Sequence, residues 1–309
     1  MMAVGDLNLN LNLKLLSYNC RGLNDSKKIY LLSLLKACDV LFLQEHWLTD
    51  GQIQDLNSVS DDHFAYGVSG FDNKEVLHGR PYGGCAILWR RNLNARISYI
   101  DSGSRRVCAV RCSFDFGSLL LINAYMPYEQ GDMSSAEFSL QLSTIDYLIQ
   151  NNAGCHVIIG GDFNVDFGRD WAHTNLLNDF CNEHFLFPVV HHVKNEIDYS
   201  YNFGMQRFQL IDHFILSEQF FKEFVSKVNV LHDIDNLSDH DPIALELLLN
   251  TAHLSTSRCQ FVPKVAWYKA KPEDCCAYAE LLRHKLTGID IPVASVLCHD
   301  VFLLRSIAP

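Results

Sequence analysis

The stretch HVIIGGDFN, residues 156–164, decides the fold. Its opening run is mostly β-branched and too short for a helix, which predicts a buried strand. We expect the two glycines to halt this strand and turn the backbone sharply, so that Asp162 and Asn164 project to one side of an extended segment. An attacking water could then sit between them. The alternative is an Asx-turn or helix cap, a common use of Asp and Asn after a strand.

Polar motifs end or follow other apolar runs in the same way. They are SYN at 17–19, LQE at 43–45, NAY at 123–125, IDH at 211–213 and SDH at 238–240. Strand ends are where a β scaffold gathers distant polar side chains into one cleft. Each motif alone also fits a turn, a cap or a core residue. One cleft explains all six together, so the sequence predicts a single active site.

Strand patterns alternate with helix patterns along the chain. Helices are expected from a cap among residues 24–26 through Leu35 and over Ser134–Ile149. Some strands are joined by hairpins and others by helices, which predicts two mixed β-sheets face to face with helices outside, a four-layer α/β sandwich. The expected strands are Leu7–Tyr18, Val40–Leu43, Cys85–Trp89, Val107–Phe114, Ser118–Tyr125, His156–Ile159, Phe208–Leu216 and Pro242–Leu249.

The domain organisation follows from where these patterns begin and end. We expect a lead-in over residues 1–13, the main domain over 14–249, and a linker with a small helical appendage over 250–309. The appendage carries a helix start near residues 271–274 and a stop at Gly288, with an apolar stripe between them. Such a stripe indicates packing and not chemistry.

Composition places the chain among ordinary globular proteins. The hydrophobic fraction is 48% and the charged fraction 20% over 309 residues. No apolar run is long enough to span a bilayer, and the N-terminus lacks the pattern of a secretory leader, so we expect neither a membrane partner nor secretion. The 11 cysteines include no Cys-x-x-Cys pair, which favours reduced thiols in the nucleus or cytoplasm.

Charge is distributed unevenly. The net charge of −11 argues against a globally basic nucleic-acid coat. Residues 80–111, however, carry seven arginines and one acid, an excess of about +6. Together with nearby aromatic residues, this favours a polynucleotide and makes Arg80, Arg90, Arg91 and Tyr201 candidates for substrate binding. The alternative is that the arginines lie on solvated strand faces.

The motif residues carry recognisable chemistry. Mg²⁺ prefers oxygen ligands, and Glu45 is the leading candidate because a buried strand-end carboxylate needs a cation or a hydrogen-bonded partner. Asp212 could pair with His240 and raise the basicity of the ring. The phenol of Tyr125 could donate a hydrogen bond to charge developing on a phosphate. For each residue alone, a turn, cap, exposed or core role is the plainer alternative.

Residues 14–249 resemble the endonuclease/exonuclease/phosphatase superfamily. The resemblance implies an α/β sandwich and Mg²⁺-dependent hydrolysis of phosphoesters, with Mn²⁺ as a possible substitute. Its implied roles, position by position, are metal binding by Asn19 and Glu45, a transition-state donor in Tyr125, water positioning by Asp162 and Asn164, orientation of His240 by Asp212, and completion of the metal or catalytic cluster by Asp239.

Three segments look most like endonuclease domains of non-LTR, LINE-type retrotransposons: SYNCRGL at 17–23, GRPYGG at 79–84 and LIDH at 210–213. VAWYKA at 265–270 resembles the connector to a reverse transcriptase, which implies such a domain as a partner missing from this chain. Two departures favour a retrotransposon-like nickase over abasic-site repair. Arg21 stands where apurinic-site nucleases carry an acid, and Tyr128 stands where many relatives have Asn.

The expected function is therefore Mg²⁺-dependent nicking of DNA that leaves a 3′-hydroxyl. Two alternatives remain open. The same site could act on RNA tails or on phosphorylated lipid or inositol head groups. The chain could also be a catalytically idle element remnant that only binds.

Overall fold

The computed structural model describes residues 10–72, 79, 81–193, 197–204, 207–250, 273, 276–280 and 283. The chain divides into two compact units, Met1–Lys264 and Val265–Pro309. The described residues of the second unit are helical. The expected linker and the connector-like segment at 265–270 lie outside the described residues, so the division at residue 250 stays a prediction.

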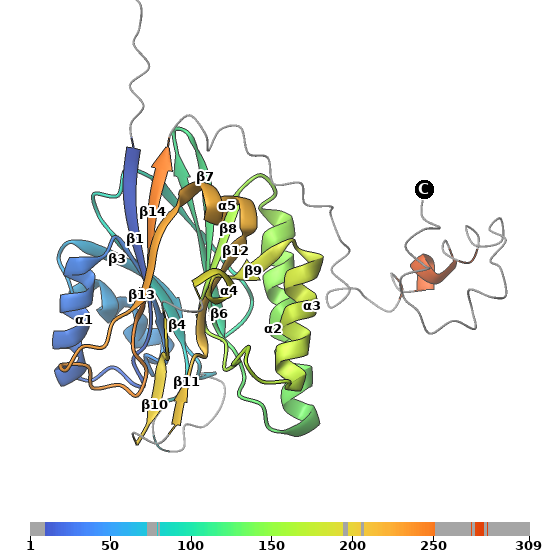
Figure 1. Cartoon of the computed structure of the whole chain (residues 1–309), viewed down its shortest axis with the longest axis horizontal. Helices are drawn as coiled ribbons and strands as arrows, with labels where there is room; N and C mark the ends of the chain where they lie inside the picture. The colour runs from blue at the N-terminus through green and yellow to red at the C-terminus, as the bar shows by residue number, and fades with distance from the viewer. Residues whose placement is uncertain are drawn as a thin grey trace, which may run out of the picture. The chain divides into compact units, whose positions relative to one another are not determined.

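Two six-stranded sheets make up the first unit (Figure 1). The strand order of the first sheet is β13 (Val225–Val230), β14 (Ile243–Asn250), β1 (Asn10–Asn19), β2 (Val40–Gln44), β4 (Cys85–Arg90) and β3 (His63–Val68). The order of the second is β5 (Arg96–Ile100), β6 (Val107–Phe114), β7 (Gly117–Tyr125), β8 (His156–Asp162), β12 (Asp212–Ser217) and β9 (Leu186–Pro188). In each sheet one pair of strands is parallel, β1 with β2 and β7 with β8.

Shorter elements complete the unit. A two-stranded hairpin is formed by β10 (Tyr201–Phe203) and β11 (Arg207–Gln209). The helices are α1 (Asp25–Ala37), the 3₁₀ helix η1 (Asp50–Ser58), α2 (Gly131–Asn151), α3 (Ala172–Glu183), α4 (Val190–Val193) and α5 (Glu218–Phe224). None of the helices in the described part of the chain combines the length and apolar character that a membrane crossing requires.

The layers follow from which residues each element buries. Side chains such as Leu15, Phe42, Ile158 and Phe214 fill the space between the two sheets. The apolar face of α1 packs on the outside of the first sheet, whereas α2 and α3 cover the outside of the second (Figure 1). The predicted four-layer α/β sandwich is thus confirmed.

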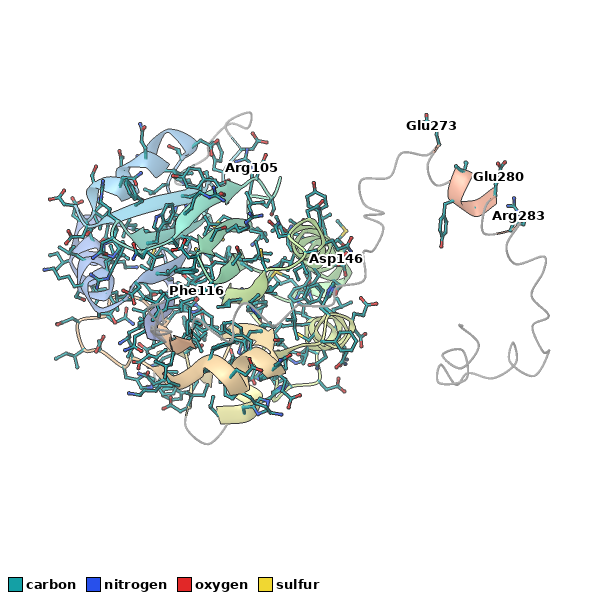
Figure 2. The ribbon with its side chains drawn as sticks, turned by 90° about the horizontal axis from the view of Figure 1, so that it is seen from above. Arg105, Phe116, Asp146, Glu273, Glu280 and Arg283 are labelled. Carbon is teal, nitrogen blue, oxygen red and sulfur yellow. The ribbon has the colours of Figure 1, made fainter. Side chains whose placement is uncertain are left out.

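The two outer helices of the second sheet are tied together by a polar contact. Asp146, labelled on α2 in Figure 2, lies 3.1 Å from the ring of His184 just beyond α3. The cysteines that the structure describes are all free thiols, as expected for a chain without a disulfide framework.

The strand predicted over Phe208–Leu216 is wrong in one respect, because it is broken into β11 and β12. Arg207–Gln209 pair with β10, whereas Asp212 and the residues after it pair with β8. The chain leaves one partner strand and joins another, so its ladder is interrupted at Leu210 and Ile211. This places Asp212 at the start of a strand.

The expectation that Gly160 and Gly161 halt a strand is also wrong. Strand β8 continues through both glycines to Asp162. A Cβ atom on Gly161 would lie 1.9 Å from the carbonyl oxygen of Ala124, and one on Gly160 would lie 2.7 Å from the ring of Phe214. The glycines therefore permit close packing of β8 against its neighbours, and the strand continues to Asp162 at its C-terminal end.

Candidate active site

Strand register brings three of the predicted site residues together. Asp162 is the last residue of β8 and pairs with Tyr125 on the parallel strand β7 and with Asp212 on the antiparallel strand β12. Asn19, at the end of β1, reaches across from the other sheet and donates from Nδ2 to Asp162 Oδ2 over 2.9 Å. The site therefore lies where the ends of both sheets meet.

One pocket gathers most of the predicted residues. Glu45, Asp162, Asn164, Asp239 and His240 all line it, as does the proposed substrate-binding residue Tyr201. These side chains come from four separate segments of the chain, so only the fold brings them together. The remaining lining residues are Arg21, Tyr128, Phe203, Gln209 and Ile211.

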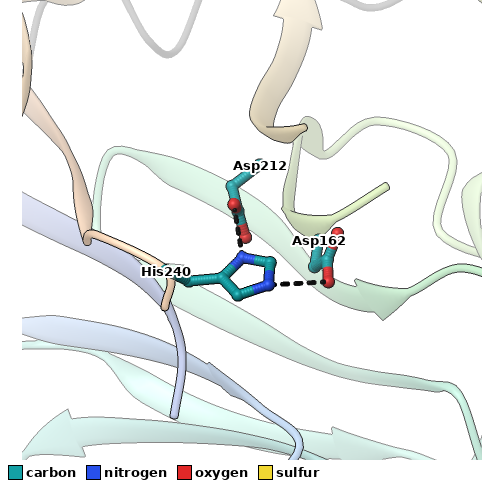
Figure 3. A group of neighbouring side chains, drawn as sticks. All are labelled: Asp162, Asp212 and His240. Carbon is teal, nitrogen blue, oxygen red and sulfur yellow. Dashed lines mark hydrogen bonds and ion pairs between the residues drawn. The ribbon is translucent and has the colours of Figure 1, made fainter. Parts of the chain in front are cut away.

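Asp212 holds His240 in a buried chain of polar groups (Figure 3). Nδ1 of the ring lies 2.8 Å from Asp212 Oδ2, and Nε2 lies 3.9 Å from Asp162 Oδ2. Ser200 donates to the same Asp212 oxygen over 2.7 Å, and its own hydroxyl accepts from the backbone N–H of Asp212. A carboxylate on one ring nitrogen fixes the tautomer and leaves the other nitrogen facing the pocket.

The charges of these buried polar groups shift the pKa values of His240 and Asp162. Burial disfavours the imidazolium of His240, but the carboxylates of Asp212 and Asp162 outweigh it and raise the pKa of the ring to about 10. Burial, followed by the negative charge of Asp212, raises the pKa of Asp162 well above its ordinary value. At neutral pH His240 is therefore positively charged, and Asp162 holds its proton more tightly than a free carboxyl does.

Glu45 is held in a strained loop after β2. Its backbone has a φ of 53°, in the left-handed region that residues other than glycine rarely adopt. Asn19 donates to Oε1 over 2.9 Å, and the indole of Trp47 donates to Oε2 over 3.0 Å. Gly22 makes room for that indole, because a Cβ there would lie 2.0 Å from it. Such strain is concentrated at functional sites, where surrounding contacts enforce it.

The GRPYGG segment supports the same loop. The backbone N–H of Glu45 donates to the carbonyl of Gly84 over 2.8 Å, and that of Trp47 donates to the carbonyl of Gly83 over 3.0 Å. A side chain on Gly84 would place its Cβ 2.4 Å from the ring of His46. Gly84 is thus needed for the two loops to approach each other closely.

The pocket fits a hard divalent cation. Glu45 and Asp239 offer carboxylate oxygens there, the ligands that Mg²⁺ prefers. One of these oxygens, Asp239 Oδ1, is buried without a hydrogen-bond partner, which is costly unless a cation or water takes it. A more deeply buried group of Asp162, Asp212 and His240 also has ligand atoms within 4.8 Å of one another. We favour the first set, because Glu45 and Asp239 both line the pocket, whereas Asp212 does not.

Asn19 has a different arrangement from the other predicted metal-site residues. Its amide nitrogen faces Glu45 and Asp162, and its amide oxygen accepts from the backbone N–H of Arg21 over 3.0 Å. It is fully buried and does not line the pocket. In this arrangement Asn19 orients two carboxylates, and its metal-binding role stays a prediction.

Asn164 and Tyr125 stand on either side of Asp162. The sequence predicted an extended segment here, which is wrong at Asn164, because its φ is 52° and its N–H donates to Asp162 Oδ1. Asp162 and Asn164 therefore form an Asx-turn and also line the pocket. Tyr125 is near Glu45 and Asp162, and burial followed by these two charges raises the pKa of its phenol above the usual range, so it remains a hydrogen-bond donor.

The arginine candidates Arg90 and Arg91 do not line this pocket. Arg90 bonds the carbonyl of Cys38 and pairs with Asp39, and Arg91 covers the ring of Phe64. Both lie at the end of β4 opposite the one that pairs with Gln44, because the strands run antiparallel. Arg80 lies outside the described residues. The structure thus gives Arg90 and Arg91 structural contacts away from the pocket.

Sequence reasoning missed several residues that build the site. Trp47 stands two positions after Glu45, a spacing that could have suggested the same side of an extended segment. Arg21 and Tyr128 depart from the family pattern, and that pattern does not predict that they line the pocket. Ser200 gave no signal, because a serine between two tyrosines has no pattern that predicts a partner 12 residues away.

Comparisons with known proteins agree with this fold. A profile of the Endonuclease/Exonuclease/phosphatase family matches residues 16–240. The fold is similar to the endonuclease domain of TRAS1, a telomere-specific non-LTR retrotransposon, with 12% identity, a TM-score of 0.57, and coverage of 77% of this chain and 98% of that one. A search of curated proteins found no match.

Two further solved structures share the fold. The AP endonuclease LMAP from Leishmania major is 16% identical with a TM-score of 0.60, covering 77% of this chain and 88% of that one. The 3′ phosphatase NExo from Neisseria, bound to a product DNA hairpin, is 15% identical with a TM-score of 0.57, covering 76% and 99%. Because the family profile spans most of the chain, the protein belongs to the endonuclease/exonuclease/phosphatase family.

Proposed function

We propose that this protein is a Mg²⁺-dependent endonuclease that nicks DNA and leaves a 3′-hydroxyl. The observation that carries the proposal is the meeting in one pocket of Glu45, Asp239, Asp162, Asn164 and His240. Separate groups for cation binding, for water and for phosphate charge are what phosphodiester hydrolysis requires. The similarity to a retrotransposon endonuclease domain and to an AP endonuclease supports DNA as the substrate.

Each residue has a role that its surroundings permit. Glu45 and Asp239 would hold Mg²⁺, which when bound supplies Lewis-acid polarisation of the phosphate. Asp162 accepts the proton of a water that it positions together with Asn164, and its raised pKa suits a general base. The positive ring of His240, fixed by Asp212, stabilises charge on the phosphate oxygens.

Tyr125 and the partner domain complete the proposal. The phenol of Tyr125 donates a hydrogen bond as charge develops on the phosphate. A reverse transcriptase would extend the 3′-hydroxyl, and the connector-like sequence at 265–270 supports such a partner. We place the protein in the nucleus or cytoplasm, in keeping with the free thiols of the described cysteines.

Plasmid nicking tests the proposal. Purified protein is incubated with supercoiled plasmid in Mg²⁺ and in EDTA, beside Asp162→Ala and the control Asp179→Ala, an exposed residue of α3. We expect Mg²⁺-dependent relaxation by the wild type and the control, and a loss of about 10²-fold or more in Asp162→Ala. Extension of the nicked strand by a DNA polymerase would show the 3′-hydroxyl.

A second substrate class follows from the same pocket. The fold is also similar to a 3′ phosphatase, so phosphomonoesters, RNA tails and phosphorylated lipid or inositol head groups belong in the assay panel. If the protein hydrolyses one of these compounds and does not nick DNA, that compound class and not DNA is its substrate. Binding without turnover of any of them, unaffected by EDTA and by Glu45→Gln, would indicate an idle remnant.

A further inference from the structure

The candidate pocket is lined by more acidic than basic side chains. Three carboxylates line it, those of Glu45, Asp162 and Asp239. Among the described lining residues, the cationic side chains are Arg21 and His240. His240 is committed to Asp212 and is buried. The Arg21 side chain is 52% exposed and that of His240 is 7% exposed, so an incoming anion meets Arg21 first.

Hydrogen bonds hold the backbone of Arg21, whereas its guanidinium group is partly exposed. Its φ is 45°, its N–H donates to Asn19 Oδ1, and its carbonyl accepts from Lys27 Nζ over 2.8 Å. The guanidinium, by contrast, is joined through Nη1 to Asp239 Oδ2 at 2.5 Å, and the side chain is 52% exposed. The local fold thus holds Arg21 at the pocket while its charged end can change partners.

Arg21 and a divalent cation would compete for the same carboxylate. Asp239 has one oxygen on Arg21 and one buried oxygen without a partner. A cation bound there neutralises the charge that attracts the guanidinium, and so weakens the ion pair. The released guanidinium presents paired N–H donors whose planar geometry matches phosphate oxygens.

We propose that Arg21 is a phosphate-binding residue, which exchanges Asp239 for a substrate phosphate when a divalent cation occupies the pocket. This inference rests on the proposed function. It adds a phosphate contact from Arg21, which stands where apurinic-site nucleases carry an acid. The exchange keeps Arg21 from meeting a bare phosphate before the cation is in place. Arg21 would thereby couple cation binding to substrate binding.

The proposal predicts opposite effects of one substitution on two ligands. Without Arg21, Asp239 is freer to bind a cation, so Mn²⁺ should bind Arg21→Ala about 2- to 5-fold more tightly than wild type, the size expected for a partly exposed ion pair. The same variant should bind DNA about 10-fold or more weakly, because a charge-assisted hydrogen bond is lost. A purely structural role would weaken both.

Two binding measurements test it without turnover. Mn²⁺ binding to the protein alone is followed by the electron paramagnetic resonance signal of free Mn²⁺. Binding of a fluorescently labelled DNA duplex is followed by anisotropy with Ca²⁺ in an Asp162→Asn background, across a series of salt concentrations. The slope of log affinity against log salt should fall by about 1 in Arg21→Ala.

Two further variants make the comparison strict. Lys222→Ala removes an exposed positive charge on α5 whose partner, Glu218, is in the same helix, and it should change neither binding constant. Arg21→Lys keeps the charge without the planar fork, and should restore the salt slope but only part of the DNA affinity. Thermal unfolding establishes that each variant is folded.

The outcomes separate this inference from the proposed function. Unchanged DNA affinity in a folded Arg21→Ala, or unchanged or weaker Mn²⁺ binding, overturns the exchange while leaving nicking by the wild type intact. A folded wild type that neither nicks nor binds any polynucleotide overturns the DNA substrate, and the phosphate role of Arg21 with it. Tighter Mn²⁺ binding together with weaker DNA binding supports both.

Discussion

Oδ2 of Asp212 lies 2.8 Å from Nδ1 of His240, although 28 residues separate the two in sequence. The same oxygen accepts from the hydroxyl of Ser200, whereas Oδ1 of Asp212 is buried without a hydrogen-bond partner. All three side chains are buried. The ring of His240 is therefore oriented by one carboxylate oxygen, and its other nitrogen is directed toward Asp162.

Asp212→Asn should reduce nicking by about 10- to 100-fold, the cost typical of losing a partner that orients a functional histidine. The amide keeps the shape of the carboxylate but removes the negative charge that holds the ring positive. Single-turnover rates on plasmid would measure the loss, and the pKa of His240 from NMR titration should fall. A variant with wild-type rate would show that the pair is structural.

The contribution of His240 to the stability of the protein should fall as the pH rises, when measured in EDTA. The pKa of His240 is raised from 6.5 to about 10. Its contribution is complete below the pKa of the unfolded chain and is lost as the pH rises through about 10. The raised pKa of Asp162 acts in the same direction, because ionising this buried carboxyl costs more in the folded state.

The measurement is chemical unfolding of wild type and His240→Gln between about pH 6 and about pH 10. The difference in unfolding free energy between the two should shrink across that window. A constant difference would mean that folding does not change the pKa of the ring, and a difference that grows with pH would mean that the folded ring is neutral.

Much of the fold follows from local patterns. Strand β6 occurs at the expected residues, and α1 begins at Asp25 with Asn24 accepting from the backbone N–H of Lys27, as the cap pattern indicated. Such elements combine strong apolar periodicity with clear boundary residues. The short elements β9, β10 and α4 were not expected, because three or four residues carry too little periodicity to distinguish a strand or helix from a loop.

The sequence predicted the polar residues of the site but not the contacts that hold them in place. Asp162 ends an apolar run and Asp239 stands just before one, positions at which a buried carboxylate is costly unless it has a partner. Gly161 looked like a turn residue, because sequence does not reveal that the carbonyl of Ala124 lies against it. Asn123 shared the strand-end pattern, yet it joins the sheets by donating to the carbonyls of Leu43 and Ala86. Contacts between sheets have no local sequence signal.

Ser200→Ala should lower the free energy of unfolding by about 1–3 kcal/mol, because a buried hydroxyl that donates to Asp212 and accepts from two backbone N–H groups is removed. The nicking rate should fall as well, since Asp212 loses one of the two donors on Oδ2. Ser200→Thr keeps the hydroxyl and should recover more of the rate than of the stability. Guanidinium unfolding and single-turnover nicking are the measurements.

Divalent cations should raise the melting temperature through Glu45 and Asp239. At a free Mg²⁺ concentration of about 100 times Kd, binding to the folded state adds about 2.7 kcal/mol. Glu45→Gln should remove most of this stabilisation, because an amide is a poorer ligand for Mg²⁺. Asp179→Asn, exposed on α3, should retain it. An equal shift in both variants would place the cation elsewhere.

Gly161→Ala should prevent stable folding, whereas Gly51→Ala should be tolerated. A Cβ atom on Gly161 would lie 1.9 Å from the carbonyl oxygen of Ala124, and that oxygen belongs to the backbone of the neighbouring strand, which has no flexible end to move aside. Gly51, in η1, has no atom within 4 Å of its Cβ position. Soluble expression and circular dichroism of the two variants give the comparison. If Gly161→Ala folds and loses only activity, then β7 and β8 can separate, and the position of Asp162 depends on their close approach more than the fold does.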